Sequence, residues 1–344
     1  MKGKSVNTIR FTRTILVSAA ATLLAAGGAQ AETKYKLSIS LETSPNHIRN
    51  IGVGEWAEYL EKKSGGKLEV KIYPSASKFK DTDVPKALNQ GAIDMGMQGT
   101  WQLGKYESDV DAADLPIFYG ITQETVYKVW DNAPGKFVEK EIEKKLGVKV
   151  IGRWLDLGFN NTYSVSKPIK VNTDMAGMKL RIPGGAGFIA RYDALGAHPI
   201  KIAWPDVPEA LQRGTVDGLA TTFESMRSAK LWDSGVKYAY VNHQTFNQYI
   251  PMIGALSWKK YPKEIQDLIV SSWAERIDDM RQRARKRQNS AREAAIKNGV
   301  QVFDPSPADV ADARKKLMAT EADLIKTLRL NPELVKLIKA EMSK

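Results

Sequence analysis

Residues 178–185 read Met-Lys-Leu-Arg-Ile-Pro-Gly-Gly, an apolar strand signal that ends in a turn. A second strand signal, His-Pro-Ile-Lys-Ile, follows at 198–202, and the helix after it ends at Gly-Thr-Val-Asp-Gly, residues 214–218. The order strand, helix, strand, helix is typical of a parallel β-sheet covered by helices. The stretch therefore predicts an α/β fold.

Arg181 lies inside the first of these strands, two residues before Pro183. Its guanidinium keeps its charge and presents a planar fork of N–H donors that matches a carboxylate. Placed in a cleft at the end of a strand, such a side chain selects organic anions. Arg181 is thus the first candidate binding residue.

The alternation of strands and helices extends in both directions along the chain. Strands are predicted at 36–41, 68–73, 93–97, 147–154, 161–166 and 300–303, with helices at 48–63 and 83–90. A long apolar stripe of helical spacing begins at Pro262 and stops at Asn298. An unbroken helix of that length would be about 55 Å long, so we expect it to cross two lobes.

The N-terminus, residues 1–31, has the pattern of a signal peptide. Four basic residues precede an apolar, Ala/Leu-rich core, and Ala29-Gln-Ala31 matches a cleavage site. Cleavage there would leave 313 residues (344 − 31) and lower the formal charge from +12 to +8, because four basic residues are removed. We therefore expect secretion into the periplasm.

The composition narrows the function further. The chain has 51 Lys and Arg residues against 39 Asp and Glu, and it has no Cys. A basic balance can indicate nucleic-acid binding. However, the densest basic run, 281–287, lies on the long polar helix without interleaved aromatic rings, which favours a solvated helix face. We expect no nucleic acid among the partners, and the absence of Cys excludes disulfides and thiolate chemistry.

Catalytic and metal-binding motifs are missing from the pattern. The three histidines, His47, His198 and His243, have no partner at helical i, i+4 spacing and no nearby acidic ligand pattern. This predicts no metal site. Neither a nucleophile elbow nor a phosphate-binding P-loop occurs. The sequence thus favours a binding protein over an enzyme.

One glycine motif keeps an alternative open. The pattern G-x-G-x-x-A occurs at Gly185-Ala-Gly187-Phe-Ile-Ala, between a strand and a helix, with Asp206 near the end of the next strand. This context is close to the fingerprint of an NAD-type dinucleotide-dependent oxidoreductase. Against it, the motif falls in mid-chain, Pro183 and Gly184 lengthen the turn, and free nicotinamide cofactors are not expected after export. The preferred interpretation is a glycine turn that leads into a packed helix, with no cofactor.

A series of short motifs, in order along the chain, resembles one known family. The motifs are Tyr35-Lys-Leu-Ser-Ile, Glu61-Lys-Lys-Ser-Gly-Gly-Lys-Leu-Glu-Val, Tyr73-Pro-Ser, Gly91-Ala-Ile-Asp-Met, Ala113-Asp-Leu-Pro, Gly177-Met-Lys-Leu-Arg-Ile-Pro, Ala194-Leu-Gly-Ala and Ala210-Leu-Gln-Arg-Gly-Thr-Val-Asp-Gly. In these motifs the chain is similar to the extracytoplasmic solute-binding proteins of tripartite ATP-independent periplasmic (TRAP) transporters, in the dicarboxylate-binding-protein-like branch. Each motif is weak alone, but the ordered set is specific.

The resemblance implies a two-lobed periplasmic binding protein fold of the α/β class, in which a long helix braces both lobes. The expected lobes are residues 32–157 plus 246–285 and residues 158–245 plus 286–344. The resemblance also implies that the protein captures a small organic acid and delivers it to a pair of membrane permease subunits, with transport driven by an ion gradient.

The resemblance extends to residues of the site. Arg181 matches the family arginine that pairs with the ligand carboxylate, and Trp204 matches a position that is commonly aromatic and lines the pocket. Four further residues fall where the first lobe would meet the ligand: Glu42, Asp81, Thr100 and Trp101.

Two departures from the family pattern bear on the ligand. Many members carry a second arginine in a Gly-aromatic-Arg motif, and here the match is Gly158-Phe-Asn160, which offers a neutral amide. Members often read Asp-Gly-Gln-Glu-Asn-Pro after the arginine segment. Here the chain reads Asp217-Gly-Leu-Ala-Thr221-Thr-Phe223, so a threonine replaces the asparagine and an aromatic ring is added. We therefore expect a monocarboxylate, with aromatic or branched hydroxy and keto acids ahead of sugar acids.

Overall fold

The computed structural model describes residues 34–344. The predicted signal peptide, residues 1–31, lies outside the described residues. Among the helices of residues 34–344, none is both long enough and apolar enough to cross a membrane.

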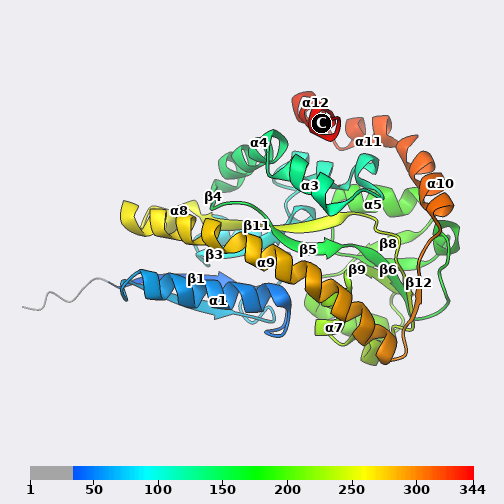
Figure 1. Cartoon of the computed structure of the whole chain (residues 1–344), viewed down its shortest axis with the longest axis horizontal. Helices are drawn as coiled ribbons and strands as arrows, with labels where there is room; N and C mark the ends of the chain where they lie inside the picture. Colours follow the sequence, from blue (N-terminus) through cyan, green and yellow to red (C-terminus); the bar gives the residue numbers. More distant parts are fainter. Residues whose placement is uncertain (1–33) are drawn as a thin grey trace, which may run out of the picture. The chain divides into compact units, whose positions relative to one another are not determined.

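The first of two mixed β-sheets is built mainly by the N-terminal half of the chain (Figure 1). Its strands, in order across the sheet, are β2 (Leu68–Tyr73), β1 (Tyr35–Ser40), β3 (Met95–Gly99), β11 (Phe246–Gly254) and β4 (Val148–Val150), and β5 (Leu155–Phe159) pairs with β11. β1 is parallel to β2 and β3, because α1 (Ile48–Lys63) and α2 (Val84–Asn89) return the chain between them. β11 is antiparallel to its three neighbours.

The second sheet contains the stretch around Arg181. Its strands, in order, are β12 (Gln301–Phe303), β10 (Tyr238–Tyr240), β6 (Asn161–Ser164), β9 (Gly218–Thr221), β7 (Lys179–Ile182) and β8 (His198–Lys201). β7 is parallel to β8 and β9, with α5 (Ala186–Ala194) and α6 (Val207–Gln212) between them, as the sequence predicts. β6 is antiparallel to β9 and β10, so this sheet too is mixed and not purely parallel.

The chain passes from the first sheet to the second at one residue, Asn160, between β5 and β6. It returns through residues 241–245, between β10 and β11. The two crossings are bonded to each other: Asn160 N donates to Thr245 O at 2.8 Å, and Gln244 N donates to Asn160 O at 2.9 Å. The ribbon of β5 and β11 therefore links the two halves at the place where a hinge would have to bend.

Helix α9 (Lys263–Lys297) confirms the long helix predicted at 262–298. Its 35 residues correspond to about 52 Å. It packs against α1 beside the first sheet and against α7 (Phe223–Ser228) beside the second (Figure 1). Trp56 of α1 meets Trp273 of α9 edge to face, with 5.4 Å between the ring centroids, and both rings are fully buried. The helix therefore braces both halves.

The C-terminal segment divides between the two halves. The remaining helices are α3 (Gln123–Trp130), α4 (Ala133–Ile142), α8 (Ala255–Trp258), α10 (Pro307–Met318), α11 (Glu321–Thr327) and α12 (Pro332–Met342). β12 joins the second sheet, whereas α12 packs on α3 and α4 beside the first. The apolar face of α12, with Leu334 and Ile338, is buried in the same cluster as Trp130. Within the expected second lobe, which included all of 286–344, β12 thus pairs in the second sheet, whereas α12 packs beside the first.

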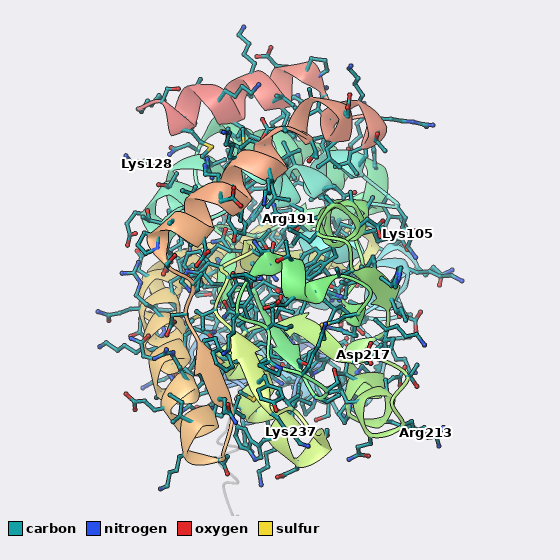
Figure 2. The ribbon with its side chains drawn as sticks, turned by 90° about the vertical axis from the view of Figure 1, so that its right-hand side faces the viewer. Lys105, Lys128, Arg191, Arg213, Asp217 and Lys237 are labelled. Atoms are coloured by element: carbon teal, nitrogen blue, oxygen red, sulfur yellow. The ribbon has the colours of Figure 1, made fainter. Side chains whose placement is uncertain are left out.

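One buried arginine, Arg191 of α5, ties the halves together without facing a ligand. Its guanidinium donates to the backbone oxygens of Gln244 at 2.6 Å and Leu115 at 2.8 Å, and also to that of Asp114. Figure 2 shows Arg191 within the molecule, whereas Lys105 projects from its edge. Because the guanidinium of Arg191 already donates to three backbone carbonyl oxygens, we assign it a structural role.

Candidate functional site

A small cavity, here called the central cavity, is lined from both sheets. Its volume is about 30 Å³, far below the ~300–1,000 Å³ of an ordinary ligand pocket. The lining residues are Glu42, Thr43, Asp81, Trp101, Gln102, Leu157, Asn160, Arg181, Pro183, Trp204, Ala220, Thr221, Ser225, Asn247 and Tyr249. The two halves are therefore closed on each other, and they would have to part to admit an organic acid.

The central cavity brings together most of the site residues predicted from the sequence. These are Glu42, Asp81, Trp101, Asn160, Arg181, Trp204 and Thr221. They come from the segments after β1, β2 and β3, from the crossing between β5 and β6, and from β7, the end of β9 and the segment after β8. Parallel strands bind ligands at their carboxyl ends, so the placement is the one expected for an open α/β sheet.

Arg181 is held rigidly in the wall. Its side chain is 2 % exposed, Nε donates to Ile202 O at 3.0 Å, and Nη1 donates to Ala220 O at 3.4 Å. The guanidinium carbon lies 5.4 Å from the ring centroid of Trp204. Burial lowers the pKa of Arg181 to about 10, so the group stays charged at neutral pH. Within residues 34–344 its hydrogen bonds go to carbonyls and not to a carboxylate.

Among the acidic groups, Asp81 has the largest stabilising effect on the charge of Arg181. It is 1 % exposed, its Oδ1 accepts from Trp204 N at 3.2 Å, and its Oδ2 accepts from Gln102 Nε2 at 2.9 Å. Burial, followed by the charge of Glu42, raises the pKa of Asp81, while Arg181 opposes the shift. Asp81 thus contacts the second half of the molecule directly and adds an acceptor to the cavity.

Beside Arg181, the site contains a further buried arginine, Arg49 in the first turn of α1, which was not predicted from the sequence. Its Nη1 donates to Glu42 Oε1 at 2.9 Å, its Nη2 forms an ion pair with Glu42 Oε2 at 2.8 Å, and Nη2 also donates to Thr43 Oγ1 at 2.7 Å. It also stacks over the ring of Tyr249, 4.1 Å from the centroid. Burial lowers the pKa of Arg49, but the pairing with Glu42 outweighs it and the net shift is upward. No local signal in the helix 48–63 separates this arginine from a solvated one.

The neutral polar groups of the wall also matter. Asn160 is 1 % exposed, and its Oδ1 has no hydrogen-bond partner among the described residues. An unpaired buried acceptor costs stability, on the order of 1–3 kcal/mol. Thr221 and Asn247, both nearly buried, lie in the same wall. The central cavity therefore contains an acceptor that a ligand donor would satisfy.

Two predicted site residues lie away from the central cavity. Phe223 is the first residue of α7, where the turn of the helix directs Ser225 toward the cavity and Phe223 away from it. Its ring packs edge to face on Tyr163, 5.6 Å between centroids, in the core of the second half. Thr100 opens a short 3₁₀ turn and is buried, but the adjacent Trp101 reaches the cavity instead. Neither residue is among those that line the central cavity.

The glycine motif at 185–190 does not leave an open anion site. The N-terminus of α5 is covered by Asp111, because a Cβ atom at Gly185 would lie 3.3 Å from Asp111 Oδ1. Burial raises the pKa of Asp111 to about 6, whereas the nearby backbone N–H groups of Gly187 and Ala186 lower it. A Cβ atom at Gly187 would lie 2.5 Å from the Cβ of Asp114. The glycines therefore permit close packing of α5, which removes the support for a dinucleotide site.

The acidic and histidine side chains of residues 34–344 were compared with the arrangement that a metal ion needs. No group of three or more His, Cys, Asp or Glu side chains there is arranged to hold a metal ion. His47 is fully buried, and the ring of His243 stacks on that of Phe159.

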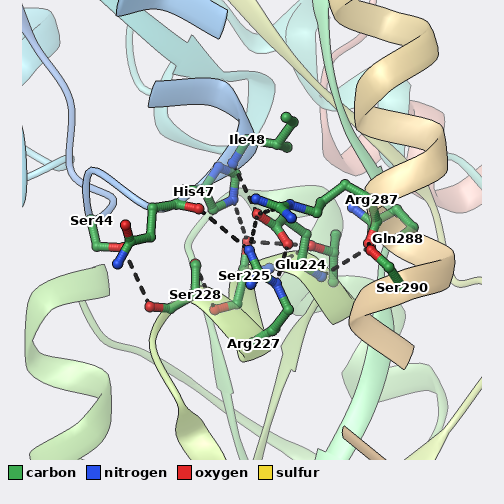
Figure 3. A network of polar contacts seen from close by, with 12 residues as sticks. Ser44, His47, Ile48, Glu224, Ser225, Arg227, Ser228, Arg287, Gln288 and Ser290 are labelled. Atoms are coloured by element: carbon green, nitrogen blue, oxygen red, sulfur yellow. Dashed lines mark hydrogen bonds and ion pairs between the residues drawn. The ribbon is translucent and has the colours of Figure 1, made fainter. Parts of the chain in front are cut away.

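A buried network joins the halves beside the central cavity (Figure 3). Glu224 of α7 is fully buried, and its Oε1 accepts from Ile48 N of α1 at 2.9 Å. Arg227 Nε donates to Glu224 Oε2 at 2.8 Å, and Arg287 of α9 lies 3.6 Å from Oε1. One carboxylate therefore connects the first helix, α7 and the bracing helix.

His47 caps α1 within the same network (Figure 3). Its Nδ1 accepts from Arg49 N at 3.1 Å, so Nε2 carries the proton and donates to Ser225 Oγ at 3.2 Å. Burial holds the pKa of His47 well below its usual range, and nearby arginines add to the shift: Arg49, Arg227 and Arg287. The closed arrangement therefore favours neutral His47.

Comparison with known proteins places the chain in a family. The family model for bacterial extracellular solute-binding protein, family 7, matches residues 39–326. The C4-dicarboxylate-binding periplasmic protein of Rhodobacter capsulatus is 26 % identical over 94 % of this chain and 96 % of its own length. The 2,3-diketo-L-gulonate-binding periplasmic protein of Escherichia coli K12 is 23 % identical over 89 % and 94 %. The chain belongs to this TRAP solute-binding family, whose members are transport components, and the family prediction is confirmed.

Solved structures share the fold. A TRAP periplasmic solute-binding protein from Sulfurospirillum deleyianum with bound succinate superposes with a TM-score of 0.82, at 24 % identity, over 90 % of this chain and 99 % of the other. The sugar-acid-binding protein of Advenella mimigardefordensis, in complex with galactonate, gives a TM-score of 0.85 at 19 % identity, over 90 % and 98 %. The predicted periplasmic binding protein fold is therefore confirmed.

Proposed function

We propose that this protein captures a small monocarboxylate in the periplasm and delivers it to the permease subunits of a TRAP transporter. The observation that carries the proposal is Arg181, a buried guanidinium in the wall of a cavity lined from both halves. Its two protein bonds orient the planar fork, and a ligand carboxylate would complete it by a bidentate pair.

The charges of the central cavity favour one carboxylate over two. Arg49 is already paired with Glu42, so it does not offer a free cation. A second ligand carboxylate would also be repelled by Asp81, which is already repelled by the negative charge of Glu42. Like charges at short range in a buried site are strongly unfavourable. A monoanion avoids this repulsion, although related structures hold succinate as well as galactonate.

Donor groups on the ligand would fit the remaining wall. Asn160 Oδ1 has no partner, and Asp81 and Glu42 are acceptors when ionised. A hydroxyl next to the carboxylate supplies the missing donor, whereas a keto oxygen does not. Trp101 and Trp204 add aromatic faces for the body of the acid. We therefore rank aromatic or branched hydroxy acids first, with sugar acids as the second candidates because they carry many donors.

A calorimetric titration series would test this ranking on the mature chain. Phenyllactate, phenylpyruvate, galactonate, succinate and malate would be compared, with the neutral amide of phenyllactate as the control for the carboxylate. We expect the hydroxy monocarboxylates to bind at least about tenfold more tightly than the C4-dicarboxylates, which is roughly 1.4 kcal/mol. Tightest binding of succinate or malate would contradict the monocarboxylate assignment.

Closure about the β5–β11 ribbon is the proposed capture step. The lobes proposed are residues 32–157 plus 246–285 and residues 158–245 plus β12, with α9 as a shared brace. Since the central cavity measures about 30 Å³, it has to open before an acid enters. Small-angle scattering should show compaction when a saturating acid is added. An identical profile with and without the acid would argue for a rigid receptor.

A further inference from the structure

A second and larger cavity lies outside the predicted site. Its volume is about 600 Å³, within the ~300–1,000 Å³ of ordinary small-molecule pockets. It is here called the hinge cavity, and its walls are the segment 120–124, strand β5, the segment 241–246, Phe223 and one face of α9.

One wall of the hinge cavity is aromatic. Phe159 at the end of β5 stacks on His243, with 4.4 Å between the ring centroids and 19° between the planes. Phe246 meets Phe159 edge to face at 4.9 Å, and Phe223 lines the same space. Phe159 is partly exposed and His243 is exposed. Such a wall offers stacking to a flat ring.

The facing wall is a polar stripe on α9. Its members recur at helical spacing on one face: Arg285, Gln288, Asn289 and Arg292. The two arginines pair with exposed carboxylates, Arg285 with Glu124 and Arg292 with Asp304. Exposed ion pairs are weak, so an incoming anion can replace these partners at little cost.

The ribbon of β5 and β11 separates the two cavities. Leu157 and Tyr249 line the central cavity, whereas Gly158 and Phe246 line the hinge cavity. Successive side chains of a strand point to opposite faces, and the register shifts between Asn247 and Gln248, where Leu157 of β5 is left unpaired. A ligand in the hinge cavity would thus lie one strand layer behind the carboxylate site.

We infer that the hinge cavity is a second small-molecule site, and that it takes a flat aromatic anion. The ring lies against Phe159 and Phe246, and the anionic group faces the arginines of α9. The inference does not depend on Arg181 or on the identity of the transported acid. It commits to an aryl carboxylate or sulfonate because the cavity, which Glu124 and Asp156 also line, places the exposed guanidinium groups of Arg285 and Arg292 opposite an aromatic wall.

Equilibrium dialysis of the mature chain with 2-naphthoate tests the inference. Asn289→Trp places a large ring at an exposed position that lines the cavity, and Lys286→Trp is the matched control at an exposed position of the same helix that does not line it. We expect Asn289→Trp to weaken binding of 2-naphthoate by about tenfold or more, and Lys286→Trp to change it by less than about twofold. Melting curves would verify that both variants fold, and Phe159→Ala replaces Asn289→Trp if that variant does not.

Two further comparisons separate this site from the central cavity. Arg181→Ala should leave 2-naphthoate binding within about twofold of wild type, and Arg292→Gln should weaken 2-naphthoate several-fold without affecting the neutral 2-naphthamide. Loss of the probe in Arg181→Ala would place it in the central cavity and overturn the inference. Absence of saturable binding by the wild type, or unchanged binding by Asn289→Trp, would overturn it as well.

Discussion

The central and hinge cavities lie on opposite faces of one ribbon and differ in how their charges are held. At the central cavity, Glu42 of the wall pairs with Arg49 behind it, and the two side chains are 5 % and 0 % exposed. In the hinge cavity the Arg285–Glu124 pair is 50 % and 63 % exposed. Arg49 contacts both oxygens of Glu42 in a pair that is shielded from water, whereas Arg285 contacts one oxygen of Glu124 in a pair that stays exposed to water. The comparison teaches that burial, and not the number of charges, determines what each cavity can recognise.

The largest effect is expected from breaking the buried pair. Arg49→Met strands the carboxylate of Glu42 without its partner, which should lower the free energy of unfolding by about 3–5 kcal/mol. Arg285→Met removes an exposed pair and should cost less than about 1 kcal/mol. Urea denaturation measures both. If Arg49→Met lowered the free energy of unfolding as little as Arg285→Met does, the distinction between the cavities would be lost. As a control, the double variant Arg49→Met/Glu42→Leu should recover most of the stability.

A smaller effect, on binding rather than folding, is expected at Arg181. Arg181→Ala removes at least one charge-assisted bond to the ligand carboxylate and should weaken acid binding about a hundredfold, or roughly 2.7 kcal/mol. Arg181→Lys should also bind poorly, because an ammonium group lacks the planar fork. Calorimetry measures both effects. The control variant Arg285→Ala should bind the acid within about twofold of wild type. Near-wild-type affinity of Arg181→Ala would refute the assignment.

The pH dependence of closure provides a third comparison. His47 has a depressed pKa in the closed arrangement, so closure is unaffected above the usual His pKa of about 6.5 and is disfavoured as the pH falls below it. The groups facing it are Arg49, Ser225, Glu224, Arg227 and Arg287. Acid affinity should fall by up to about tenfold between pH 7.5 and 5.5.

The control for this prediction is His47→Asn, which keeps a side-chain cap on α1 but does not titrate. The acid affinity of His47→Asn should change less with pH than that of the wild type over the same range. The raised pKa of Asp81 acts in the opposite direction, because its protonation favours the closed arrangement as the pH falls. A wild-type profile that coincides with that of His47→Asn would remove His47 from the closing mechanism.

The smallest effect is expected at the rim of the central cavity. Lys80 pairs with Asp206 across the halves at 2.7 Å, but the two side chains are 49 % and 46 % exposed. Lys80→Met should change acid affinity by less than about twofold, and high salt should remove the difference. A loss as large as that of Arg181→Ala would show that exposed contacts control closure.

Much of the secondary structure followed from local pattern. The helix 48–63 and the strand 68–73 have the predicted bounds, because amphipathic spacing and the stop at Ser64-Gly-Gly are encoded by neighbours in the chain. β11 was missed for the opposite reason. All nine residues of Phe246–Gly254 are buried, so the strand has no alternation, and Pro251 argues against a central strand. The predicted strand 147–154 shrank to Val148–Val150.

The sequence by itself determined the α/β class, the long bracing helix, the family and the arginine in β7, since each depends on residues close together in the chain. Only the tertiary structure decided that Arg49 and Tyr249 stand beside the central cavity and that Phe223 turns away from it. The physical reason is that local periodicity sets which face of an element is apolar, whereas the neighbours of a buried side chain depend on how two distant sheets meet. The ribbon of β5 and β11 lies where the two sheets meet, and the two cavities lie on its opposite faces.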